Sequence, residues 1–161
     1  MNRVFIIILG GIIVAYSNAI STYRETKVKT ASQGQLIIML YDACVKNLDR
    51  ALGFLKSNVG DNKDPGNIER VSSAILKTQE LITELTVSLD FEQGGEIANN
   101  LFSLYTRFSK ELLEANITQD ARRISTVRNL LDDLKSAWVE ISAKTSTDTA
   151  GIAVTGLNIA G

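Results

Sequence analysis

The sequence has no histidine, one cysteine and one proline among its 161 residues. Histidine is the usual general base and metal ligand near neutral pH, and the Glu-x-x-His ligand pairs of ferritin-like bundles cannot be written here. Cys44 cannot form an intramolecular disulfide, and its place on an apolar helical stripe indicates a small buried side chain rather than a nucleophile. The sequence therefore predicts no enzyme, no metal site and no cofactor.

Clustered charge of one sign is also absent, because 17 basic residues are interleaved with 18 acidic ones for a net charge of -1. A nucleic-acid surface needs grouped Lys and Arg to displace counterions, and the pair Arg122-Arg123 is more typical of a solvated helix face. Gly94-Gly95 indicates a turn and a helix start rather than a phosphate-binding loop for a small-molecule substrate. The 45% hydrophobic content predicts one folded domain.

Residues 1–14 form an apolar extension. A basic start at Arg3, an apolar run over residues 4–15 and small residues at 17–19 together have the layout of a secretory signal peptide. The run is shorter than the roughly 20 apolar residues that span a bilayer, so a membrane protein is not expected.

This extension has two interpretations. A cleaved signal would make the chain a secreted helical-bundle interaction protein. Alternatively, translation begins at a GTG valine codon for Val14, and residues 1–14 are not part of the native chain. We expect the second, with a cytoplasmic protein.

Four helical patterns follow, joined by short breaks. They are expected over residues 33–57 after an N-cap at Ser32, 67–89, 95–116 and 120–144, with residues 145–161 as a flexible C-terminal tail. Short connections make neighbouring helices antiparallel. The expected fold is all-α: an up-down four-helix bundle over residues 15–145, with an additional N-terminal segment packing on it.

Each helix has an apolar stripe at about 100° per residue, which predicts the core. Its members are Ile37, Leu40, Tyr41, Cys44, Leu48, Ala51 and Leu55; Ile68, Val71, Ile75, Ile82 and Leu89; Ile97, Leu101, Tyr105, Phe108 and Leu112; and Val127, Leu131, Leu134, Trp138 and Ile141.

Six apolar residues on three of these helices lie outside the stripes. A second partial stripe indicates either a wider core or an exposed groove for a partner helix, and the number of these residues favours a groove. The candidate partner-binding residues are Ile38, Met39, Leu76, Val87, Phe102 and Leu113.

Four segments in order resemble the FliS family of flagellin export chaperones. They are Thr-Ala-Ser at 30–32, Leu-Ile-Ile-Met-Leu-Tyr-Asp at 36–42, the Leu-Asp to Leu-Tyr stretch with its Gly-Gly at 89–105, and the late Trp138. Each segment alone is weak, but as an ordered set they are specific. The resemblance covers roughly residues 15–145.

The resemblance implies a cytoplasmic bundle that holds the C-terminal region of flagellin, prevents its premature polymerisation and helps deliver it to the flagellar type III export gate. It further implies that a segment with Ile20 and Tyr23 covers part of the bundle and takes part in the handover. Gln33 and Ala43-Cys44 depart from the family pattern without touching a candidate contact residue.

Overall fold

The computed structural model describes residues 33–60 and 64–159, and their side chains as far as residue 144. These residues form four α-helices. The helices are α2 (Gln33–Ser57), α3 (Pro65–Val87), α4 (Phe91–Thr118) and α5 (Ala121–Ile159).

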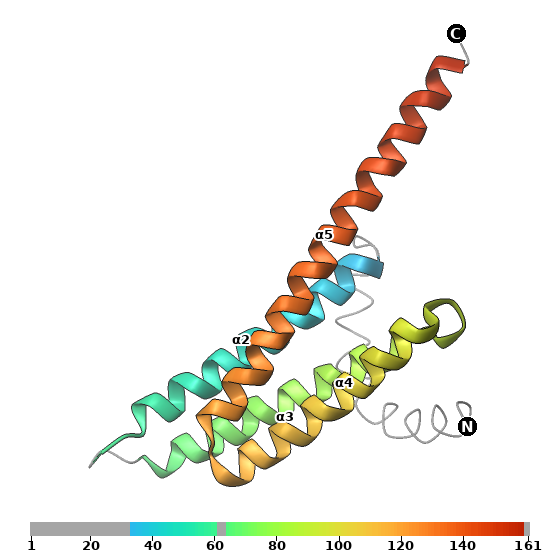
Figure 1. The fold of residues 1–161 in the computed structure, drawn as a ribbon. Helices are drawn as coiled ribbons and strands as arrows, with labels where there is room; N and C mark the ends of the chain where they lie inside the picture. The colour runs from blue at the N-terminus through green and yellow to red at the C-terminus, as the bar shows by residue number, and fades with distance from the viewer. Residues whose placement is uncertain (1–32, 61–63, 160–161) are drawn as a thin grey trace, which may run out of the picture.

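The helices pack as an antiparallel up-down bundle (Figure 1). Helix α2 packs against α3 and α5, and α4 packs against the same two helices from the other side. The all-α, four-helix prediction is confirmed for these elements. The N-terminal segment that was expected to pack on the bundle, including Ile20, Tyr23 and the proposed N-cap Ser32, lies outside the described residues.

Three aspartates begin the last three helices by accepting hydrogen bonds from the first free backbone N–H groups. The Oδ1 atom of Asp64 accepts from Gly66 N at 2.9 Å, that of Asp90 from Glu92 N and Gln93 N at 3.0 Å, and that of Asp120 from Arg122 N at 2.8 Å. Two predicted boundaries were therefore too late. Helix α3 begins at Pro65, whose missing N–H is tolerated in the first turn, and α4 begins at Phe91 rather than at Gly95.

Helix α4 is interrupted by Gly95, whose φ of 48° and ψ of -122° are not helical. The Gly-Gly pair thus marks a kink inside one helix, after a first turn that Asp90 caps. Glycine tolerates this positive φ because it has no Cβ.

Helix α5 continues to Ile159, beyond the predicted end near Lys144, and its C-terminal part extends past the other helices (Figure 1). Proline is absent from residues 145–161, so the i to i-4 hydrogen bonds can continue along the backbone despite the glycines. The flexibility of this tail stays a prediction.

The core consists of the side chains that the four inner faces bring together, and most of the predicted stripe residues are buried there. The buried core is Ile37, Tyr41, Cys44, Val45, Leu48, Ala51, Val71, Ala74, Ile75, Ile82, Leu85, Tyr105, Phe108, Leu112, Ala115, Ile124, Val127 and Leu131, with Leu40, Leu55, Leu89, Leu101, Leu134 and Trp138 partly buried against it.

Three predicted core residues are exposed instead: Ile68, Ile97 and Ile141. The first two lie near the starts of α3 and α4. Ile141 lies midway along α5, next to Ser142, which is level with Gly34 at the start of α2, so all three are near the ends of the bundle. A 100° periodicity gives the side of a helix that a residue occupies, but it does not show whether a neighbouring helix covers that level. These three assignments were wrong for that reason.

Two buried tyrosines from opposite helices meet in the core. The hydroxyls of Tyr41 on α2 and Tyr105 on α4 are hydrogen-bonded to each other, and Trp138 of α5 is partly buried against the same core. Burial raises the pKa of both tyrosines, and it raises the pKa of the Cys44 thiol to about 12. This polar contact links α2 with α4 across the core.

Stability should fall as the pH rises above about 10, the pKa of a tyrosine in an unfolded chain. The unfolded chain then loses the protons of Tyr41 and Tyr105 while the folded protein keeps them, because their folded pKa values are raised. The loss amounts to at most about 1.4 kcal/mol per tyrosine for each further pH unit. Urea unfolding at pH 9 and pH 11 measures it, and the Tyr41→Phe, Tyr105→Phe double variant should show a smaller difference. Titration of all four tyrosines near pH 10 without loss of helical signal would contradict the expectation.

Candidate functional site

Two side-chain hydrogen bonds fix how α3 and α4 lie against each other. Ser72 Oγ donates to Asn116 Oδ1 at 2.7 Å, and Gln79 Nε2 donates to the backbone carbonyl of Ser109 at 3.0 Å. From the first bond to the second, α3 advances by seven residues and α4 returns by seven. Both bonds therefore belong to one antiparallel register, which also places the residues between and beyond them.

This register brings together four of the six predicted partner-binding residues. Leu76 lies level with Leu113, and Val87 lies level with Phe102, each to within one residue. Each helix contributes two residues that are eleven positions apart, which is about three helical turns and about 16 Å. Because three turns return a side chain to the same face, the four residues form two pairs across the α3–α4 junction. We call them the outer α3–α4 surface.

The two pairs differ in how accessible they are. Leu76 and Leu113 are 54% and 53% exposed, and Val87 is 44% exposed. Phe102 is half-buried, and the ring of Phe91 packs edge-on against it with centroids 6.0 Å apart. One pair is thus open to solvent, and the other is partly covered by the first turn of α4.

The threonines between the two pairs have their hydroxyls satisfied locally. Thr83 Oγ1 donates to the carbonyl of Gln79, and Thr106 Oγ1 donates to the carbonyl of Phe102, both at 2.9 Å. A partner that covers them would not have to supply an acceptor, so burying this stretch carries little desolvation penalty.

The other two predicted residues, Ile38 and Met39 on α2, lie elsewhere. Ile38 precedes Asp42 by one helical turn, and Asp42 faces α5, where its Oδ1 is 3.5 Å from Lys135 Nζ. Both apolar side chains are half-buried, and α2 is separated from α4 by its neighbours α3 and α5 in the order of packing. Ile38 and Met39 are therefore not part of the outer α3–α4 surface. The six residues predicted to line one groove over three helices lie on two separate parts of the bundle.

The side of the bundle between α4 and α5 carries apolar residues that sequence reasoning missed. Arg123 of α5 is 2.6 Å from Glu111 of α4, which identifies the facing sides of these helices. Leu130, seven residues after Arg123, and Ile141, eleven further on, lie on that side of α5 and are exposed. Exposed Ile97 lies on the corresponding side of α4. Leu130 adjoins the core stripe in sequence, so periodicity alone could not separate it from the interior.

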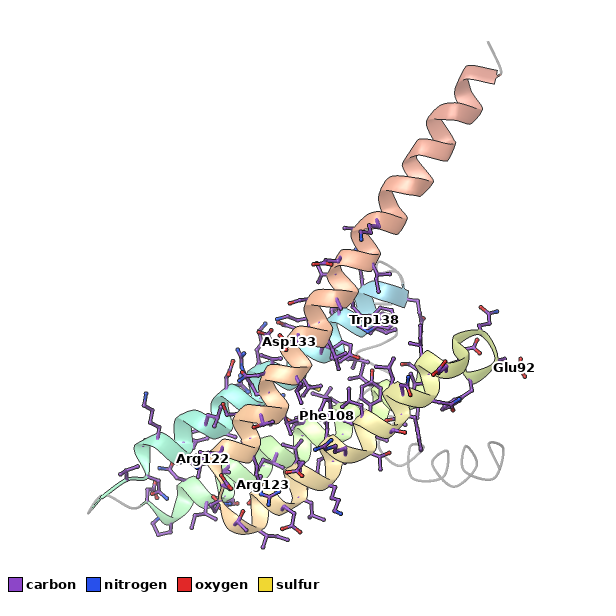
Figure 2. The ribbon with its side chains drawn as sticks, viewed as in Figure 1. Glu92, Phe108, Arg122, Arg123, Asp133 and Trp138 are labelled. Atoms are coloured by element: carbon purple, nitrogen blue, oxygen red, sulfur yellow. The ribbon has the colours of Figure 1, made fainter. Side chains whose placement is uncertain are left out.

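The described part of the chain contains neither a metal-binding cluster nor a membrane-spanning helix. No group of three or more Cys, Asp or Glu side chains there could hold a metal ion. Among the helices described, none is long and apolar enough to cross a membrane. Figure 2 shows Arg122 and Arg123 at the start of α5, where Arg123 is paired with Glu111 and Asp120.

Comparison with known proteins agrees with the resemblance drawn from the motifs. The family model described as "Flagellar protein FliS" matches residues 16–145. The chain is 39% identical over 123 residues to the flagellar secretion chaperone FliS of Salmonella typhimurium, covering 76% of this chain and 85% of that protein. It is 26% identical over 138 residues to the protein of the same name from Bacillus subtilis, covering 86% and 96%.

A solved structure described as a flagellar chaperone from bacteria has the same fold, with a TM-score of 0.61 and 16% identity over 80% of this chain and 98% of that one. The relatives are named as chaperones, which confirms that the protein is not an enzyme. Together with the bundle and the motifs that first suggested it, these matches show that the chain belongs to the FliS family of flagellar secretion chaperones.

Proposed function

We propose that this protein binds the C-terminal region of flagellin in the cytoplasm, prevents its premature polymerisation and helps deliver it to the flagellar type III export apparatus. Family membership supports the general role. The outer α3–α4 surface supports the proposed location of the binding site, because four apolar side chains there form two pairs about three helical turns apart.

A partner helix would bind this surface without any covalent chemistry. Two apolar anchors separated by about eleven residues on one face of the partner would reach the Leu76–Leu113 pair and the Val87–Phe102 pair at the same time. Burial of apolar area stabilises the complex by about 25 cal/mol per Å², against the entropy lost when the partner becomes ordered.

The flagellin C-terminal region suits such a surface. The family resemblance implies that this region is disordered alone and helical in the filament, so its apolar face is prone to aggregate until it is used. A chaperone that covers this face would keep the subunit from assembling. Ile20 and Tyr23, which precede the described residues, would cover part of the bundle before flagellin binds and would take part in its handover.

Binding and its location can be measured together. A synthetic peptide of the flagellin C-terminal region should bind the full chain in isothermal titration calorimetry with a negative heat-capacity change. A photo-crosslinking amino acid placed at Leu76 should capture the peptide, whereas the same group at exposed Val59, beyond the end of α2, should not. A peptide that binds but crosslinks equally from both positions would contradict the assigned surface.

The signal-like layout of residues 1–14 favours one alternative, a secreted helical-bundle interaction protein. The mass of the native N-terminus separates the two functions. A cytoplasmic chaperone should be recovered with its N-terminus at Met1 or near residue 14 from the cytoplasmic fraction, whereas a secreted protein should be recovered outside the cell, cleaved after the small residues at 17–19.

A further inference from the structure

The first turn of α4, residues 91–94, is set apart from the rest of its helix. Asp90 caps it through hydrogen bonds to Glu92 N and Gln93 N, and the Asp90 carbonyl accepts a further bond from Gly94 N at 2.8 Å. Gly95 then breaks the helical backbone with its positive φ. This turn is therefore a small unit of its own, joined to the main part of α4 at Gly95. We call it the α4 entry turn.

The glycine pair allows the entry turn to lie close to the helix that follows. A Cβ at Gly94 would come within 2.8 Å of the Ala98 side chain, and a Cβ at Gly95 would be strained by its φ of 48°. Glu92 and Gln93 are exposed, so the side chain that attaches the entry turn to the helix surface is that of Phe91. Figure 2 shows Glu92 at the outer end of the bundle.

Phe91 rests on one of the four residues of the outer α3–α4 surface. Its ring meets the Phe102 ring at 70°, an edge-to-face contact with a centroid distance of 6.0 Å. Phe102 is level with Val87, which is 44% exposed. An apolar side chain arriving at this pair would compete with Phe91 for contact with Phe102, whereas the Leu76–Leu113 pair would be reached directly.

We propose that the α4 entry turn is a lid on the outer α3–α4 surface. In the empty protein Phe91 covers Phe102, and when a partner helix places an apolar residue at the Val87–Phe102 pair, the entry turn moves about Gly95 and releases it. This proposal rests on the proposed function, because the ligand is the flagellin C-terminal peptide. The lid shields an aromatic side chain until binding and lowers the affinity by the free energy of its closed state.

The test combines affinity with a direct measurement of the ring contact in the full chain. Phe91→Ala should bind the peptide three- to tenfold more tightly than the parent, and Phe91→Leu should lie between them. Glu92→Ala in the same turn is the matched control and should bind like the parent. Nuclear Overhauser contacts between the two phenylalanine rings should be present in the empty protein and lost on addition of peptide.

The results separate the lid from the proposed function. If the parent binds the peptide while the ring contact persists and Phe91→Ala does not bind more tightly, the lid is overturned and the chaperone function stands. If the parent does not bind the peptide at all, both are overturned. Circular dichroism of each variant verifies that it is folded, and Phe91→Leu retains an apolar side chain should the alanine variant unfold.

Discussion

Replacing Phe108 with alanine should lower the free energy of unfolding by about 3–5 kcal/mol. The Phe108 side chain is 1% exposed in the core formed by all four helices (Figure 2). Removing its ring takes away buried apolar area and leaves a cavity that rigid neighbouring helices cannot fill. Because small domains are stable by only about 5–15 kcal/mol, the variant should be close to unfolding at growth temperature.

Urea unfolding followed by helical circular dichroism measures this effect. Ile117→Ala, on the same helix, provides the control, since Ile117 is 71% exposed and surface substitutions usually change stability by less than about 0.5 kcal/mol. Equal unfolding midpoints for the two variants would show that α4 does not pack in the register described here.

The double variant Leu76→Ser, Leu113→Ser should lose between about tenfold and a few hundredfold in affinity for the flagellin C-terminal peptide. Each anchor in a contact between a helix and a groove is worth at least about 1–2 kcal/mol, and neighbouring anchors need not add fully. Both side chains are more than half exposed in the free protein, so the stability of the variant should stay close to that of the parent.

Two further variants define where the site ends. Val59→Ser changes an exposed residue outside the surface and should bind like the parent. Ile38→Ser distinguishes the outer α3–α4 surface from a site that includes α2. An equal loss of affinity from Ile38→Ser without loss of stability would extend the site to α2. A double variant that binds like the parent would remove the outer α3–α4 surface from the site.

Local signals in the sequence were sufficient for the fold class. Four apolar stripes have helical periodicity, and short breaks separate them. The aspartate caps at Asp64, Asp90 and Asp120 were found only in the structure. The ordered motifs over residues 30–42 and 89–105 were sufficient to identify the family. The stripes and the motifs depend on residues near one another in the chain, so a single sequence contains them.

The candidate site could be predicted only in part. Leu76, Val87, Phe102 and Leu113 were predicted to lie outside the core because they depart from the stripes of their own helices, and three of them, all but Phe102, are exposed. Ile38 and Met39 also depart from the stripe of their helix. They belong to α2, which is separated from α4 by α3 and α5, and so they do not join the other four residues. Periodicity gives a direction around one helix axis and contains no information on which helix stands next to it.

The sequence by itself determined the four helices, most of the core and the family. Only the tertiary structure decided that Leu76 lies level with Leu113 and Val87 with Phe102, that Ile97 and Ile141 are exposed, and that the Phe91 ring contacts the Phe102 ring. The physical reason is that helix formation depends on contacts three or four residues apart, whereas a binding surface depends on register between helices. That register is set by distant pairs such as Ser72 with Asn116, which no local pattern reveals.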